Sequence, residues 1–98
     1  MPTIKRLDVF SLWLTELRDF RARSKIIARI DRLALGNPGD VAAVGNGVSE
    51  LRIHYGPGCR VYFVQRGIEI VVLLCGGDKA SQPSDIKMAH RLARELED

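Results

Sequence analysis

The pattern of apolar and polar positions is most regular between residues 50 and 75, where short runs of strand-forming residues are separated by turn residues. Apolar and polar side chains alternate from Glu50 to Tyr55, and a similar run follows Gly56-Pro57-Gly58. A third run, residues 70–75, is apolar throughout. Alternation predicts strands with one covered face, whereas a continuous apolar run predicts an interior strand covered on both faces. We therefore predict three antiparallel strands joined by tight turns at residues 56–58 and 66–67.

The same alternation predicts which side chains share a face of this sheet. Successive residues of a strand point to opposite faces, and a shift of the pairing by one residue would expose an apolar set to solvent. Burying the apolar sets of the first two strands together therefore fixes their register. The opposite face then carries Arg52, His54, Arg60 and Tyr62, and Lys79 lies at its rim just after the third strand. Such a cluster suits a phosphate-rich ligand.

Apolar residues recur with helical spacing before and after these strands. A helix over residues 11–19, with Asp8 or Ser11 as its N-cap, is predicted because apolar residues occupy positions i, i+3, i+4 and i+7. These are Phe10, Trp13, Leu14 and Leu17. A second helix is predicted from Phe20 to Leu35, where a Gly-Asn-Pro-Gly sequence ends it. A third helix is predicted near the C-terminus, capped by Ser81 or Ser84.

The remaining segments complete the predicted fold. Residues 3–8 are predicted to form a short edge strand, and residues 36–49 a glycine-rich loop. This loop lacks the Gly-Lys-Ser/Thr ending of a phosphate-binding loop, so we do not expect a nucleotide site there. The order of elements predicts an α+β fold in which a helical hairpin covers the sheet. The length predicts one domain over residues 1–98.

Composition narrows the class of protein further. The chain is 46% hydrophobic and 28% charged, as in ordinary globular proteins. No apolar run approaches the ~20 residues of a membrane span, and the first residues lack the apolar segment of a secretory signal, so we expect a cytoplasmic protein that does not associate with membranes. The two cysteines, Cys59 and Cys75, are predicted to point to opposite faces and lack metal-ligand spacing. We expect them to be reduced packing residues, and we expect neither a metal nor another cofactor.

Positive charge is concentrated in the first third of the chain. Residues 1–35 contain eight Lys or Arg and four Asp or Glu, whereas the remaining residues contain seven and eight. Most of this charge lies on the second predicted helix, in Arg21, Arg23, Lys25, Arg29 and Arg32. A basic face is typical of nucleic-acid binders and also of proteins with acidic protein partners. Charge alone does not separate these two classes.

Several motifs occur in an order and spacing that resemble a known family. They include Glu50-Leu51-Arg52-Ile53, the run from Tyr55 to Phe63, the run from Leu73 to Gln82, and Gly36-Asn37-Pro38-Gly39-Asp40. Together they resemble the HigB-like addiction-module killer proteins of the RelE/ParE toxin superfamily, over essentially the whole chain. One departure is Cys59, which stands where the family more often has an aromatic residue, so a stacking ring is not expected there.

The resemblance implies a type II toxin with a RelE-like fold. Such toxins generally cut messenger RNA in the translating ribosome without a metal. The implied partners are the ribosome with its message and a cognate helix-turn-helix antitoxin of the HigA type, through which alone operator DNA would be contacted. ParE-type members of the superfamily inhibit DNA gyrase instead, which is the main alternative. A silenced toxin that only binds its antitoxin is a third reading.

The resemblance also implies roles for individual residues. Arg60 and Lys79 match the basic residues of the second hairpin strand and of the segment after the last strand, and Arg52 matches the Glu-Leu-Arg motif. Cleavage by a 2′-hydroxyl needs proton transfer and stabilisation of the phosphorane charge. Arginine forks and a lysine can supply the charge stabilisation. Histidine exchanges protons near neutral pH, so His54 is the candidate acid or base.

Simpler interpretations stay open for several of these residues. Glu50 and Tyr62 are reserve candidates for proton transfer, and Tyr62 is also a candidate RNA contact. Arg52 could instead pair with Glu50 or Glu69 on a solvated face, and His54 could be an ordinary residue near a turn. His90, on the last helix, is expected on the surface or against a neighbouring element.

Overall fold

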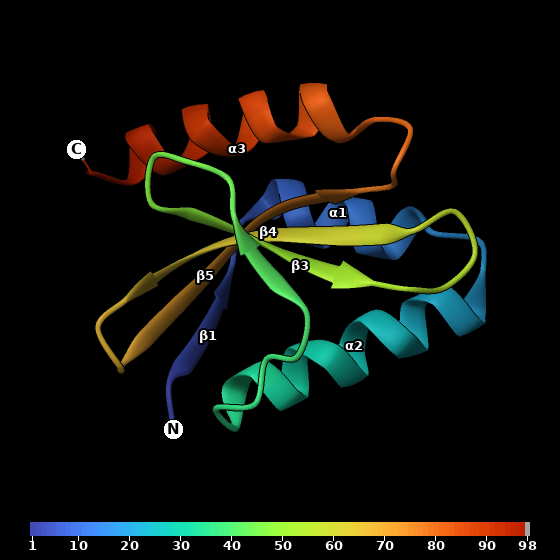
Figure 1. The fold of residues 1–98 in the computed structure, drawn as a ribbon, viewed down its shortest axis with the longest axis horizontal. Coiled ribbons are helices and arrows are strands. Elements are labelled where there is room, and N and C mark those ends of the chain that lie inside the picture. Colours follow the sequence, from blue (N-terminus) through green and yellow to red (C-terminus); the bar gives the residue numbers. More distant parts are fainter. Residues whose placement is uncertain (98) are drawn as a thin grey trace.

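The computed structural model describes residues 1–97, which form a five-stranded sheet with helices on both faces (Figure 1). In chain order the elements are β1 (Thr3–Arg6), α1 (Asp8–Glu16), α2 (Phe20–Ala34), β2 (Val41–Ala43), β3 (Val48–Ile53), β4 (Cys59–Arg66), β5 (Ile70–Gly77) and α3 (Gln82–Glu97). The strand order is β1-β5-β4-β3-β2, in which only the β1–β5 pair is parallel. The predicted α+β fold, compatible with the RelE type, is confirmed.

Two apolar clusters hold the helices to the sheet. On one face, α1 buries Phe10 and Leu14 of its predicted apolar stripe against β3, β4 and β5. The helix α2 packs beside it through Ala22, Ile26, Ile30 and Leu33. On the other face, α3 packs on the sheet through Ala89, Leu92 and Ala93. The strand β5 lies between β1 and β4, and its residues Val71–Cys75 are buried. The prediction of an interior strand covered on both faces is therefore confirmed.

The ends of the first helix differ from the prediction. The helix α1 begins at Asp8 rather than at residue 11 and ends at Glu16, and its N-cap is Leu7, which makes no side-chain cap bond. The proposed caps, Asp8 and Ser11, therefore lie inside the helix, where Asp8 is an acidic residue of the first turn. The helix α2 begins at Phe20, as predicted. Asp19 is its N-cap, because the Asp19 carboxylate accepts hydrogen bonds from the backbone amides of Arg21 and Ala22.

Part of the predicted glycine-rich loop is a strand. Residues Val41–Ala43 form β2 and pair antiparallel with β3, after which a turn at residues 45–47 reverses the chain. All three turn residues have positive φ angles, 92° at Gly45, 55° at Asn46 and 77° at Gly47. A strand of three residues is too short for alternation to reveal it in the sequence. Its presence matters because it fixes the position of Asp40, directly before it.

The Gly76-Gly77 pair at the end of β5 allows close packing on both faces of the sheet. A Cβ atom at Gly76 would overlap the ring of Trp13 in α1, and one at Gly77 would overlap the carboxylate of Asp85 in α3. Both contacts lie next to Cys75, which faces α3, whereas Cys59 faces the opposite core, as predicted. Both thiols are free and buried. Within residues 1–97, no helix combines the length and apolar character needed to cross a membrane.

Candidate functional site

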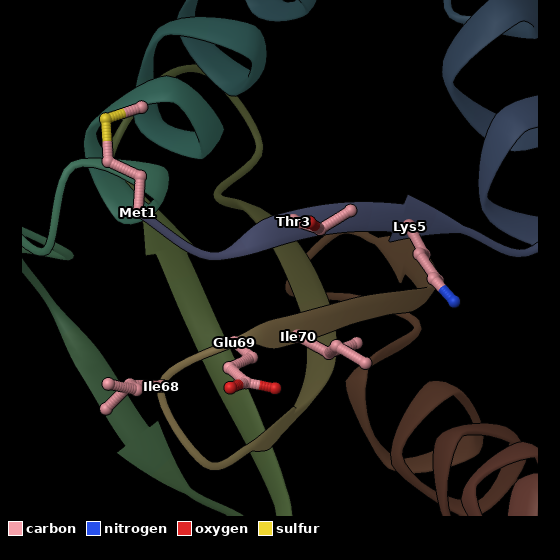
Figure 2. Close-up of a pocket in the computed structure, with 6 residues that line it drawn as sticks. All are labelled: Met1, Thr3, Lys5, Ile68, Glu69 and Ile70. Carbon is pink, nitrogen blue, oxygen red and sulfur yellow. The ribbon is translucent and has the colours of Figure 1, made fainter.

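An open hollow lies at the turn between β3 and β4, beside the segment that follows β5. It has a volume of about 590 Å³ and is lined by His54, Tyr55, Gly56, Pro57, Gly58, Arg60 and Lys79. Three of the residues predicted for catalysis, His54, Arg60 and Lys79, therefore meet at one site. A second hollow of about 530 Å³ at the β1 edge is lined by Met1, Thr3, Lys5, Ile68, Glu69 and Ile70, none of which was predicted for the site (Figure 2).

Hydrogen bonds to backbone carbonyls of the β3–β4 turn hold the first hollow together. The amide of Lys79 donates to the carbonyl of Pro57 at 3.2 Å, which joins the segment after β5 to the β3–β4 turn. Arg60 Nη1 donates to the carbonyl of Gly58 at 2.9 Å. Arg60 also lies directly across from Arg52 in the strand register, so the two arginines share one face of the sheet, as predicted. The turn, Arg60 and Lys79 thus form one connected unit.

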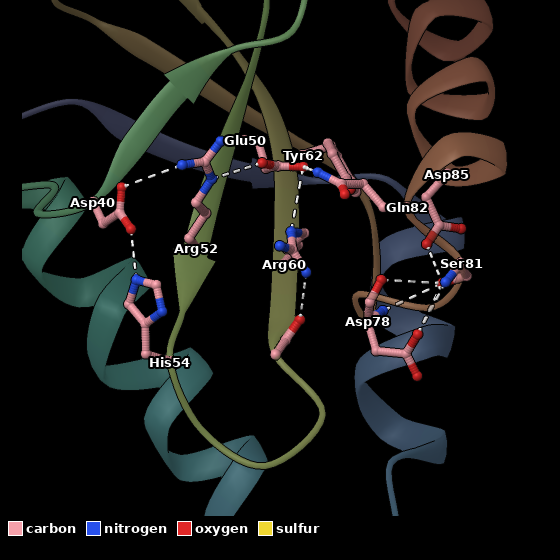
Figure 3. A network of polar contacts seen from close by, with 11 residues as sticks. Asp40, Glu50, Arg52, His54, Arg60, Tyr62, Asp78, Ser81, Gln82 and Asp85 are labelled. Atoms are coloured by element: carbon pink, nitrogen blue, oxygen red, sulfur yellow. Dashed lines mark hydrogen bonds and ion pairs between the residues drawn. The ribbon is translucent and has the colours of Figure 1, made fainter.

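A fully buried carboxylate, that of Glu50, lies next to the guanidinium groups of both arginines (Figure 3). Its Oε1 accepts from Arg52 Nε at 2.9 Å, and its Oε2 accepts from the Tyr62 hydroxyl at 3.0 Å and from Gln82 Nε2 at 2.8 Å. Burial alone would raise the pKa of Glu50, but these hydrogen bonds and the charge of Arg60 lower it below its usual value. Glu50 is therefore an ionised anchor for the side chains around it.

The burial of Glu50 and Tyr62 overturns two predictions. Neither residue has any accessible surface, so neither can touch a substrate in this conformation. The expected contact of Tyr62 with RNA is wrong, as is the reserve role of both residues in proton transfer. Burial and the hydrogen bond to Glu50 raise the pKa of Tyr62, which keeps its hydroxyl protonated as a donor. Tyr62 therefore supports the site from within the core, through its hydrogen bond to Glu50.

The two arginines differ in how far they reach solvent. The Arg52 side chain is 39% exposed, while its Nε pairs with Glu50 and its Nη1 lies 3.9 Å from an Asp40 oxygen. The simpler interpretation, a pair between Arg52 and Glu50, is therefore present in the structure, although part of the guanidinium still faces solvent. The Arg60 side chain is 14% exposed, and its buried Nε lies 3.5 Å from Glu50 Oε2 without a hydrogen bond.

Asp40 is a partner of His54 that was not predicted from the sequence. His54 directly follows β3, its side chain is 75% exposed, and its Nε2 lies 2.5 Å from Asp40 Oδ2. Its second ring nitrogen points to the side where Arg60 lies (Figure 3). The hydrogen bond with His54, together with the charge of Arg52, lowers the pKa of Asp40. Nothing in the sequence indicates the contact between Asp40 and His54, beyond the position of Asp40 at the end of the Gly-Asn-Pro-Gly-Asp motif.

One arginine of the basic helix also has a structural role. Arg29 donates from Nη2 to the carbonyl of Pro38 at 2.8 Å and from Nη1 to the carbonyl of Arg52 at 2.6 Å. These bonds join α2 to the loop before Asp40 and to the end of β3. Burial lowers the pKa of Arg29. Arg29 therefore helps to fix the relative position of Asp40 and Arg52 rather than serving as part of a solvated face.

The start of α3 completes the polar network. The amide of Ser81 donates to Asp78 Oδ1 at 3.1 Å, and its hydroxyl donates to Asp85 in the first turn of the helix. Burial raises the pKa of Asp85. Further along α3, His90 Nε2 lies 2.8 Å from the carbonyl of Val44, so His90 contacts a neighbouring element, as one of its two predicted alternatives stated.

The charge balance of the site is less positive than the sequence indicated. Glu50 and Asp40 each lie beside an arginine, so they offset much of the charge of Arg52 and Arg60. No ion pair among the side chains of residues 1–96 involves Lys79, whose side chain is exposed at the hollow. In the same part of the chain, no group of three or more His, Cys, Asp or Glu side chains is placed to hold a metal ion.

Comparison with known proteins places the chain in a family. Residues 13–96 match the model of the family described as Phage derived protein Gp49-like (DUF891). The chain is 50% identical over 93 residues to an uncharacterized protein of Haemophilus influenzae, an alignment that covers 95% of this chain and 94% of that relative. The Gp49-like family is a RelE-like toxin family of type II toxin–antitoxin systems. Because the match spans most of the sequence, the chain belongs to the phage-derived Gp49-like protein family.

Proposed function

We propose that this protein is the toxin of a HigB-like type II toxin–antitoxin module and that it cleaves messenger RNA on the translating ribosome without a metal. The observation that carries the proposal is the convergence of His54, Arg60 and Lys79 on one open hollow, with Arg52 beside it. Membership of a toxin family supports the same conclusion. The partners are then the ribosome with its message and a helix-turn-helix antitoxin.

The proposed reaction uses the 2′-hydroxyl of the nucleotide before the scissile phosphate. Its oxygen forms a bond to phosphorus while the bond to the 5′-oxygen breaks, which leaves a 2′,3′-cyclic phosphate and a 5′-hydroxyl. The free ring nitrogen of His54 accepts the 2′ proton, and the Asp40 carboxylate stabilises the imidazolium that results. The leaving 5′-oxygen takes its proton from solvent.

Stabilisation of the phosphorane falls to the cationic side chains. Arg60 and Lys79 line the hollow from two sides, and Arg52 presents its exposed part next to them. Charges that are already oriented cost no reorganisation when the transition state forms. Glu50 supplies that orientation because it anchors Arg52 and lies close to the Nε of Arg60.

A reconstituted translation reaction with a 5′-labelled message tests the proposal. The wild-type chain should produce discrete fragments whose downstream products carry a 5′-hydroxyl. Arg60→Ala and Lys79→Ala should each lower the cleavage rate by about a hundredfold or more. Arg66→Ala and Lys87→Ala remove exposed cations outside the hollow and should cleave like the wild type.

Two results would overturn this function. One is an intact message at a protein level that arrests growth. The other is inhibition of gyrase in a supercoiling assay with no cleavage in translation, which would instead support the ParE-type alternative. Relief of growth arrest by a neighbouring helix-turn-helix protein would identify the antitoxin and exclude a silenced copy.

A further inference from the structure

We propose that the surface beside the candidate site binds the nucleotides that flank the cleaved phosphate, as a single-stranded RNA subsite formed by Phe20, Lys25 and Tyr55. This inference rests on the proposed RNA cleavage and concerns how its substrate is held. Two further hollows adjoin the first one and share residues with it.

The three hollows lie next to one another along a path from the candidate site to α2, because each shares a lining residue with the others. One of about 480 Å³ is lined by Phe20, Arg21, Ser24, Lys25 and Tyr55, and it shares Tyr55 with the candidate site. Another of about 320 Å³ is lined by Lys25, Ala28, Arg29, Arg32, Ile53 and His54, and it shares His54 with the candidate site. Lys25 belongs to both. A strand whose phosphate lies near Arg60 would therefore pass Tyr55 before it reaches the first turn of α2.

The two aromatic rings of this path lie beside cations, and they differ in exposure. The Tyr55 side chain is half-buried against the core, whereas Phe20 is largely open to solvent. Phe20 is 76% exposed, with the Arg23 guanidinium 5.3 Å from its ring centroid. Lys25 Nζ lies 5.4 Å from the centroid of Tyr55. An exposed phenylalanine at the start of a helix contributes little to the core of this protein. Stacking rings interleaved with cations are the usual means by which proteins bind single-stranded nucleic acid without reading its sequence.

The local charge favours a polyanion. Arg21, Lys25 and Arg32 line the two hollows, and no carboxylate lines either of them. Asp19 and Asp31 adjoin lining residues in sequence, and Asp40 pairs with His54. The Asp19 carboxylate accepts hydrogen bonds from the first amides of α2. The hydroxyl of Tyr55 also lies 3.5 Å from Asp19, which orients the ring. The continuity with the site favours the substrate strand over an acidic protein partner.

Single-turnover cleavage on programmed ribosomes tests the subsite. Phe20→Ala and Lys25→Gln should raise the toxin concentration at half-maximal rate by at least about fivefold, because stacking on one base contributes about that much or more. Both substitutions should change mainly this concentration, and the cleavage rate at saturating toxin should change little. Leu35→Ala, which removes another exposed apolar side chain near the far end of α2, and Lys87→Gln on α3 are matched controls that should change neither.

A message with abasic residues next to the cleaved position separates the possible contacts. With this message, the wild-type concentration at half-maximal rate should rise by the same factor as it does for Phe20→Ala on the normal message. The concentration required by Phe20→Ala should not rise further. If the effects of the abasic message and of Phe20→Ala add up, Phe20 contacts ribosomal RNA instead. If a Phe20→Ala or Lys25→Gln variant cleaves normally but is no longer neutralised by the antitoxin, the surface binds a protein. Either result overturns the inference. If the wild-type chain cleaves and Phe20→Ala behaves like Leu35→Ala, only the subsite fails, whereas no cleavage by the wild type refutes the proposed function itself.

Discussion

Replacing Glu50 by glutamine removes one negative charge from the centre of the buried network while nearly preserving the shape of the side chain. Glu50 accepts hydrogen bonds from three side chains and lies 3.5 Å from a fourth, the Nε of Arg60. The glutamine amide brings two donors into a pocket lined by donors. At least one of Arg52, Tyr62 and Gln82 must then lose its acceptor.

The expected cost follows from these contacts. A hydrogen bond to a charged group contributes about 1.5–3 kcal/mol, and breaking a buried ion pair by removing one partner costs about 3–5 kcal/mol. Arg52 is partly exposed and can regain contact with water, so the lower part of this range applies. We expect Glu50→Gln to lower the free energy of unfolding by about 3 kcal/mol. With a urea m-value of about 1.5 kcal/mol/M, the unfolding midpoint falls by about 2 M.

Urea unfolding followed by the fluorescence of Trp13 measures this change. The Trp13 ring packs on Gly76, so unfolding moves it into solvent. Glu69→Gln removes an exposed carboxylate at the β4–β5 turn and is the matched control, with an expected change within about 0.5 kcal/mol. A Glu50→Gln midpoint equal to that of the control would refute the view that Glu50 anchors the network.

The pH dependence of folding stability provides a second test of the role of Glu50. The pKa of Glu50 in the folded protein lies below its usual 4.5. Its ionised form therefore stabilises the fold fully above about pH 4.5, and this contribution disappears as the pH falls through the lower folded-state pKa. The difference in stability between wild type and Glu50→Gln should be largest at neutral pH and should shrink in acid. A difference that grows in acid would contradict the assignment.

Three further predictions concern other parts of the site and core. Gly77→Ala should lower the free energy of unfolding by about 2 kcal/mol or more, measured by urea unfolding, because its Cβ overlaps a carboxylate of α3; an unchanged midpoint would show that α3 can shift. Asp40→Asn should slow cleavage about tenfold at an unchanged melting temperature, since it weakens the orientation of His54; an unchanged rate would remove His54 from the proposed reaction. Cys59 and Cys75 should be unreactive to Ellman's reagent in the folded protein and fully reactive in urea, since both are buried and burial raises the pKa of Cys75 to about 12.

The sheet and its register could be predicted because they depend on a repeating pattern. Alternation over six or more residues identified β3 and β4 and placed Arg52 and Arg60 on the same face, where the structure pairs them. The strand β2 escaped because three residues do not establish a period. The start of α1 was misplaced because Leu7, its N-cap, has no side chain that can cap a helix, so the usual polar signal was missing.

The candidate site could be predicted in part for a related reason. Strand alternation shows which face a side chain occupies but not how deeply it lies there. Tyr62 and Arg60 are on the predicted face, yet Tyr62 is covered by α3 and Arg60 reaches the hollow. The contacts of Asp40 with His54 and of Gln82 with Glu50 join segments that are distant in sequence, and no local pattern indicates them.

The parallel pairing of β1 with β5 has a consequence for the order in which the chain can fold during synthesis. Thr3 pairs with Ile70 and Arg6 with Leu73, so the first strand made must wait for the last one. Lys79 and Gln82 lie later still. The sheet and the hollow are therefore completed only after residues 70–82 have left the ribosome. A nascent copy of this protein has no assembled site, which leaves the cell an interval in which a partner already present can reach it.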